Sequence, residues 1–144
     1  MSQTALSVHG LAAILEDDRW IVEKRGTGCI IRPGEGPLVS WVHFAVPTLV
    51  ILNTIRLKYN RLFSRLRSGS QATIEQIQIR DGDTLVADIT ENYSNPNYEI
   101  RNWVITPREQ PAWNACVVSF SVKFGANFDS DAWIVFSSVA IEFV

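Results

Sequence analysis

Side chains near the C-terminus alternate between apolar and polar with a period of two. The apolar members of this pattern are Cys116, Val118, Phe120, Val122 and Phe124. Small or polar residues stand between them, and this alternation is typical of a strand with one face in a core. Residues 132–144 are equally apolar up to the last residue. We therefore predict two C-terminal strands that pair as a hairpin through the loop 125–131.

Short apolar runs recur along the rest of the chain, separated by glycine, proline and aspartate turns. We expect strands at residues 6–15, 20–24, 29–32, 38–45, 49–52, 73–80, 84–90 and 98–106. Gly10 predicts a bulge or a close backbone approach, and Asp81–Gly82 predicts a hairpin turn.

Residues 55–67 fit either a strand or an amphipathic helix. We favour the strand, because strands flank the segment and no residue cleanly caps a helix start. The total is about nine or ten short strands. It predicts an all-β fold, a jelly-roll-like antiparallel β-sandwich in which residues 1–144 form a single domain.

Composition excludes several classes of function. The formal net charge of −2 gives no general attraction to nucleic acid or to anionic membranes. No apolar stretch approaches the roughly 18 residues that a membrane span needs. The N-terminus lacks the basic and then apolar pattern of a signal peptide. We expect a cytoplasmic protein, and non-classical export stays open.

Four short motifs, spread in order over most of the chain, carry a resemblance. They are Val8–Gly10, Gly26–Gly28, Trp41–Thr48 and Ile77–Gly82. In these motifs the chain resembles a loosely defined group of small uncharacterised bacterial β-sandwich proteins. The resemblance implies an all-β sandwich and implies no activity.

The sequence contains only two histidines, His9 and His43. Neither takes part in a spacing that is typical of metal ligands, so we expect no metal and no cofactor. The simplest interpretation is that each ring bonds to the backbone. The alternative is one pocket lined by His9, Trp41 and His43, which with a carboxylate would suit a small-molecule isomerase or cyclase.

Positive charge is concentrated in one predicted strand, at Arg61, Arg65 and Arg67. On a sheet face these side chains form a candidate anion patch for a phosphate, a sulfated sugar or single-stranded nucleic acid. The alternative explanation is a solvated face, or an edge strand protected from aggregation by its charges. We favour this second interpretation, so nucleic acid is not an expected partner.

Aromatic and amide side chains gather around the predicted loops between residues 91 and 113. The candidate recognition surface consists of Trp113, Tyr93, Tyr98, Asn95 and Asn97. An aromatic ring can stack on the apolar face of a sugar while amides bond its hydroxyls. The same residue types are also enriched where subunits meet.

These observations favour a binding or assembly module over an enzyme. Our first prediction is a non-enzymatic β-sandwich module that assembles with copies of itself. The alternative is a lectin-like module that binds a carbohydrate or another small ligand. An enzyme that uses His9 and His43 in a β pocket ranks third.

Overall fold

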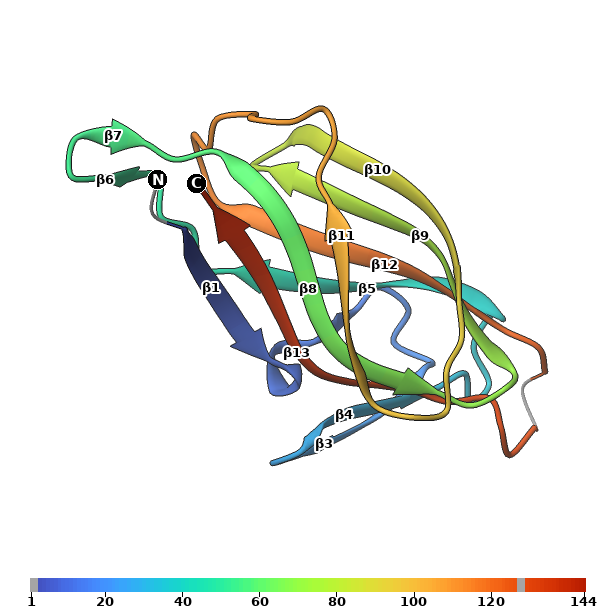
Figure 1. The fold of residues 1–144 in the computed structure, drawn as a ribbon. Coiled ribbons are helices and arrows are strands. Elements are labelled where there is room, and N and C mark those ends of the chain that lie inside the picture. The colour runs from blue at the N-terminus through green and yellow to red at the C-terminus, as the bar shows by residue number, and fades with distance from the viewer. Residues whose placement is uncertain (1–2, 127–128) are drawn as a thin grey trace.

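The computed structural model describes residues 3–126 and 129–144, and it consists mainly of two antiparallel sheets packed face to face (Figure 1). Sheet A has the order β11 (Glu99–Val104), β8 (Tyr59–Ser68), β13 (Ile134–Phe143), β4 (Gly28–Arg32) and β3 (Ile21–Arg25), and β1 (Thr4–His9) also pairs with β13. Sheet B has the order β10 (Thr84–Tyr93), β9 (Ala72–Asp81), β12 (Cys116–Phe124), β5 (Val39–Val46) and β2 (Ile14–Leu15). The predicted all-β antiparallel sandwich is confirmed.

Most of the predicted strands are present. Among the described residues, ten strands have five residues or more, which agrees with the predicted nine or ten. A two-stranded ribbon of β6 (Ile51–Leu52) and β7 (Ile55–Arg56) projects from the sandwich beside the end of β13 (Figure 1). The ambiguous segment 55–67 is extended, as β7 and β8, and the Asp81–Gly82 turn joins β9 to β10 as predicted.

The predicted first strand is interrupted at Gly10. β1 ends at His9, a short 3-10 helix η1 follows at Gly10–Ala12, and the chain then enters sheet B as β2. A Cβ atom on Gly10 would lie 1.9 Å from the Phe136 carbonyl oxygen. The close backbone approach predicted for Gly10 is therefore confirmed.

The predicted C-terminal hairpin is wrong. β12 lies in sheet B between β9 and β5, whereas β13 lies in sheet A between β8 and β4. The connection 125–131, of which residues 127–128 lie outside the described residues, therefore crosses between the two layers. A period of two fixes which side of a strand is buried, but it does not identify the strand's partner.

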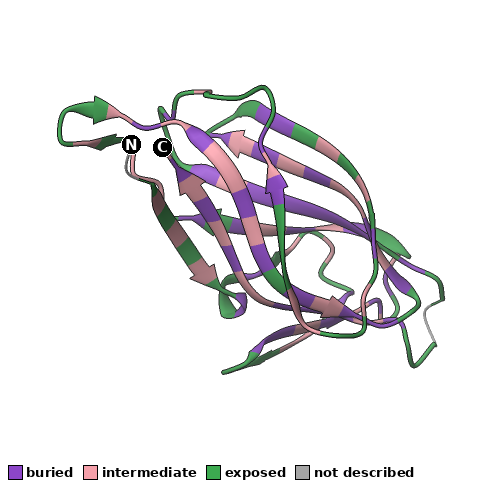
Figure 2. Ribbon diagram, in the orientation of Figure 1, coloured by how far each residue is buried: buried purple, intermediate pink, exposed green. Residues whose placement is uncertain are grey.

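The core lies between the sheets, and Figure 2 shows buried positions along the strands of both layers. Phe136 of β13 packs on Phe44 of β5 with ring centroids 5.2 Å apart, and on Phe120 of β12 at 4.9 Å.

Cys29 and Cys116 are free and buried, and burial raises the pKa of the Cys116 thiol to about 12. The described part of the chain contains no helix that is long and apolar enough to cross a membrane.

Candidate functional site

A pocket lies on the outer face of sheet B, the side turned away from the core. Its volume is about 300 Å³, and its lining comes from β5, β9, β12 and the turn after β2. The lining residues are Glu16, Trp41, His43, Gln78, Arg80 and Ser119. The pocket thus combines one indole with an amide, a guanidinium, an imidazole, a carboxylate and a hydroxyl.

Strand register brings these side chains together. His43 of β5 lies opposite Ser119 of β12, and Ser119 lies opposite Gln78 of β9. Residues that face each other across antiparallel strands project to the same side of the sheet. Two residues before His43 on β5, Trp41 lies opposite Ser121. The outer face of the sheet therefore has two adjacent rows of side chains that run across the strands. One row contains His43, Ser119 and Gln78, and the half-buried Trp41 lies in the other, next to Ser121.

His43 is held by hydrogen bonds at both ring nitrogens. Its Nδ1 lies 2.7 Å from the Ser119 hydroxyl, and its Nε2 lies 3.3 Å from Glu16 Oε1. An ionised carboxylate can only accept, so Nε2 donates to Glu16. Ser119 is only 2% exposed in the middle of a strand, which suits a group that orients the imidazole better than a nucleophile that substrate must reach.

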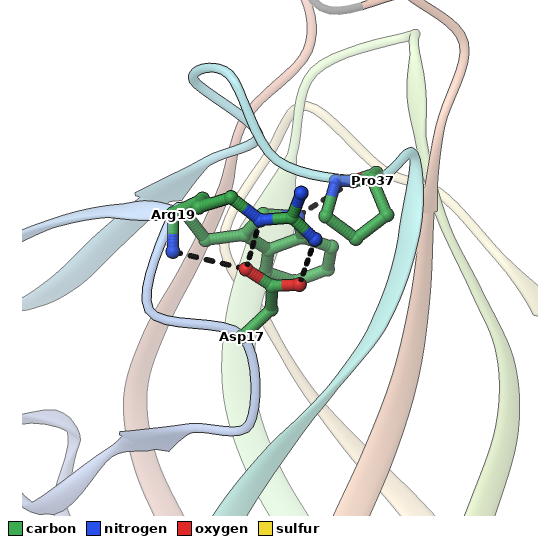
Figure 3. Close-up of polar contacts among 4 residues, drawn as sticks. Asp17, Arg19 and Pro37 are labelled. Carbon is green, nitrogen blue, oxygen red and sulfur yellow. Dashed lines mark hydrogen bonds and ion pairs between the residues drawn. The ribbon is translucent and has the colours of Figure 1, made fainter.

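A tight turn positions Glu16 beside the pocket. The Glu16 amide donates to the Trp41 carbonyl at 3.1 Å. In the turn that follows, the Arg19 guanidinium donates two hydrogen bonds to Asp17, at 3.0 and 2.7 Å (Figure 3). These side-chain bonds, with the Arg19 backbone amide, lower the pKa of Asp17 to about 2. Trp20 anchors the turn to the loop before β5 through a 2.7 Å bond from its indole nitrogen to the Pro37 carbonyl.

The predicted pocket of two histidines is not formed. His9 lies on β1 in sheet A, and its ring nitrogens lie within hydrogen-bond distance of the Gly26 carbonyl and the Leu11 amide. Trp41 and His43 do line one pocket, but on sheet B. Among residues 3–126 and 129–144, no three His, Cys, Asp or Glu side chains cluster closely enough to hold a metal ion.

The five residues of the predicted aromatic and amide surface do not form one surface. Trp113 is 58% exposed and lies near the start of β8. The guanidinium carbon of Arg56 is 3.6 Å from the centre of its ring. Tyr98 precedes β11 and lies against Arg67 at the other end of β8. Tyr93 is 5% exposed and belongs to the core.

The two predicted asparagines lie in the loop between β10 and β11, close to the end of β8. The Asn95 carbonyl accepts from the Ser68 amide at 2.7 Å, and the Asn95 side chain accepts from the Asn97 amide at 2.9 Å. The loop is thereby fixed to β8 on the side of Tyr98. The structure thus brings Asn95, Asn97 and Tyr98 together and leaves Trp113 apart.

The predicted anion patch lies on an inner strand, because β8 is flanked by β11 and β13. Arg65 and Arg67 share the outer face of sheet A and both contact the Tyr98 ring. Arg61 projects from the same face further along β8 and bonds to Asn102 at 3.3 Å. The edge-strand interpretation of these charges therefore does not apply.

Sequence reasoning missed four residues of the sheet B pocket, Glu16, Gln78, Arg80 and Ser119. A signal for two of them was present, since Gln78 and Arg80 alternate with the buried Ile77 and Ile79 in β9. This alternation places an amide and a guanidinium on one outer face. Their proximity to Trp41 depends on the order of strands in the sheet, which alternation does not specify.

Comparison with known proteins gives one family and several solved structures. A model described as "Family of unknown function (DUF6623)" matches residues 1–144. Comparison with curated protein sequences gives no match.

Solved structures with a similar fold include three carbohydrate-binding modules. A family 29 module from Piromyces equi is 7% identical, with a TM-score of 0.59 over 99% of this chain and 91% of that one. A family 35 module from Clostridium thermocellum is 12% identical, with a TM-score of 0.53 over 96% and 97%. The C-terminal family 6 module of an enzyme from Zobellia galactanivorans is 10% identical, with a TM-score of 0.51 over 96% and 98%. At these identities the likeness establishes the fold alone.

Proposed function

The chain belongs to this family of unknown function over its whole length, and from that starting point we propose that it is a carbohydrate-binding module. Its sugar site is the pocket on the outer face of sheet B. The observation that carries the proposal is the placement of Trp41 beside Gln78, Arg80 and His43 on one exposed sheet face.

The chemistry of this pocket matches what a sugar ring offers. One face of a pyranose ring is lined by C–H groups, which stack on an indole. The hydroxyls at its rim both donate and accept, so they pair with the amide of Gln78 and with the donors of Arg80. Because His43 is already held by Ser119 and Glu16, the imidazole loses little conformational freedom when a ligand binds.

The fold comparisons support ligand binding over self-assembly. The three solved structures described above are all carbohydrate-binding modules. The self-assembly that we predicted first has no comparable support. The predicted lectin-like function therefore takes first place, and its site moves from the surface around Trp113 to the pocket around Trp41.

A panel of purified polysaccharides tests the proposal by affinity electrophoresis, in which binding retards the protein in the gel. The wild type should be retarded by at least one neutral polysaccharide. Trp41→Ala should weaken that binding at least about tenfold, the usual effect of truncating a central aromatic contact.

Trp113→Ala is the matched control, because Trp113 is also a surface tryptophan but lies outside the pocket. It should bind like the wild type. Equal loss in both variants, loss in Trp113→Ala alone, or no retardation of the wild type by any polysaccharide would contradict the proposal.

A further inference from the structure

The outer face of sheet A, opposite the proposed sugar site, carries a cluster of arginine and aromatic side chains. The guanidinium carbons of Arg65 and Arg67 each lie 4.7 Å from the centre of the Tyr98 ring. The Arg67 guanidinium also lies 5.3 Å from the Trp133 ring. Both aromatic rings therefore hold positive charge in place on an exposed sheet face.

These two guanidinium groups are close together and lack a counter-charge. Because both distances are measured to one ring centre, the two charged carbons are separated by no more than twice 4.7 Å. Among the residues that the structure describes, no carboxylate forms an ion pair with either arginine. The Nε atom of Arg67 is buried and has no hydrogen-bond partner within the same part of the chain. Two adjacent like charges with a buried free donor are unfavourable unless an anion joins them.

Hydroxyl groups complete the surroundings of the arginine pair. A β-bulge in β13 takes Ser137 out of the ladder with β8. Ser137 then lines a cavity of about 320 Å³ together with Thr27, Arg65, Arg67 and Tyr98. Guanidinium groups and hydroxyls both donate hydrogen bonds, and carboxylate and sulfate oxygens accept them.

A second cavity adjoins the first across Arg67. It has a volume of about 180 Å³, and its lining includes Arg67, Arg32, Trp133 and Ser130. Arg67 thus separates two neighbouring cavities, and each contains at least one further hydroxyl. A ligand with repeated charged units could place one unit in each cavity.

We propose that this face of sheet A is a second binding site, which takes an acidic polysaccharide through its carboxylate or sulfate groups. Arg65 and Arg67 together bind one charged group in the cavity that they line with Tyr98. Arg32, which lines the second cavity and also bonds to Glu23 at 3.2 Å, receives the next group along the ligand, beyond Arg67. The site is on the other sheet from the Trp41 pocket, so it does not rest on the proposed function.

The cluster suits an acidic sugar better than a nucleic acid. Single-stranded nucleic acids bind by stacking bases on open aromatic faces. Here guanidinium groups already lie over Tyr98 and Trp133. The formal net charge of −2 also opposes general attraction to a polyanion, so binding depends on this local arrangement.

Isothermal titration calorimetry with three oligosaccharides tests the site. The probes are oligogalacturonate, which carries carboxylates, sulfated dextran oligomers, and unmodified dextran oligomers as the neutral reference. We expect the wild type to bind at least one acidic probe, and whichever probe binds more tightly identifies the charged group. Arg65→Gln should weaken this binding about tenfold, and Arg65→Gln/Arg67→Gln should weaken it further.

The control variant Arg25→Gln/Arg108→Gln makes the same change in net charge at two exposed positions outside the cluster. It should bind the acidic probes within about twofold of the wild type. Arg65 is exposed, so the single variant keeps the test valid if the double variant unfolds. Trp41→Ala should leave acidic binding unchanged, which separates failure of this site from failure of the sugar pocket.

Three results would overturn the proposal. The first is that neither acidic probe binds the wild type. The second is an equal loss in the Arg25/Arg108 control, which would indicate unspecific charge attraction. The third is equal or tighter binding of an oligothymidylate of matched charge, which would assign the face to single-stranded nucleic acid.

Discussion

Tyr59 donates its hydroxyl to Asp81 Oδ1 at 2.9 Å, and this bond joins β8 of sheet A to β9 of sheet B through the core. Asp81 is 3% exposed, and it also accepts from the backbone amides of Trp113 and Asn114, both at 2.9 Å. Burial and this bond raise the pKa of Tyr59 well above its usual range. One buried carboxylate thus satisfies three donors and fixes the loop before β12.

Replacing this carboxylate should be costly. Asp81→Ala would leave the Tyr59 hydroxyl and two loop amides without their acceptor, so we expect a loss of about 2–4 kcal/mol in the free energy of unfolding. Urea denaturation followed by tryptophan fluorescence measures it. Asp83→Ala, in the exposed part of the same turn, should change stability by less than about 0.5 kcal/mol. Equal stability of the two variants would contradict this role of Asp81.

Gly10 should not tolerate a side chain. A Cβ there would meet the Phe136 carbonyl oxygen at 1.9 Å, and backbone atoms of β13 cannot move aside easily. We expect Gly10→Ala to destabilise the protein by more than about 2 kcal/mol, seen as a lower urea midpoint.

Gly26→Ala is the matched control for Gly10→Ala. A Cβ at Gly26 would meet nothing within 4 Å. This variant should be as stable as the wild type or slightly more stable, because alanine reduces the freedom of the unfolded chain. If Gly10→Ala were as stable as Gly26→Ala, the close approach of η1 to β13 would be disproved.

Glu91 should contribute a stability that acid removes. Burial favours its neutral form, but hydrogen bonds from the Trp103 indole at 2.6 Å and from the Asn92 amide, with the Arg101 charge, lower its pKa overall. A group whose pKa is lowered on folding stabilises the protein above its ordinary pKa of about 4.5, and this contribution is lost as the pH falls below that value.

Thermal unfolding at a series of pH values measures this contribution. Glu91→Gln should be less stable than the wild type at neutral pH, and the difference should shrink below about pH 4.5. Glu35→Gln, at an exposed position, should follow the wild-type curve throughout. A constant difference between Glu91→Gln and the wild type across the acid range would refute the predicted titration.

The sequence predicted the strands well because burial on one face leaves a local, two-residue signal. It did not predict which layer each strand joins, as the wrong pairing of β12 with β13 illustrates. Layer assignment depends on long connections and on packing between sheets, such as the contact of Phe44 with Phe136. Those contacts link residues far apart in the chain, and no spacing rule describes them.

For the candidate sites too, groupings within one strand could be predicted, whereas groupings between distant segments could not. Trp41 with His43, and Arg65 with Arg67, could be grouped in advance because each pair is two residues apart on one strand. Tyr93 could not be assigned to the core, because it sits beside a polar loop in the sequence and packs inward only at the end of β10. The grouping of Trp113 with Tyr98 failed because the two lie at opposite ends of β8.

The indole N–H signals of the five tryptophans provide the most direct test of the proposed sugar site. Each signal can be assigned in a ¹H–¹⁵N spectrum by single substitution to phenylalanine, and then followed while a neutral oligosaccharide that binds is added. We predict that the Trp41 signal shifts until the protein is saturated, whereas the Trp113 signal stays in place. A shift of Trp113 with Trp41 unmoved would contradict a sugar site on the outer face of sheet B.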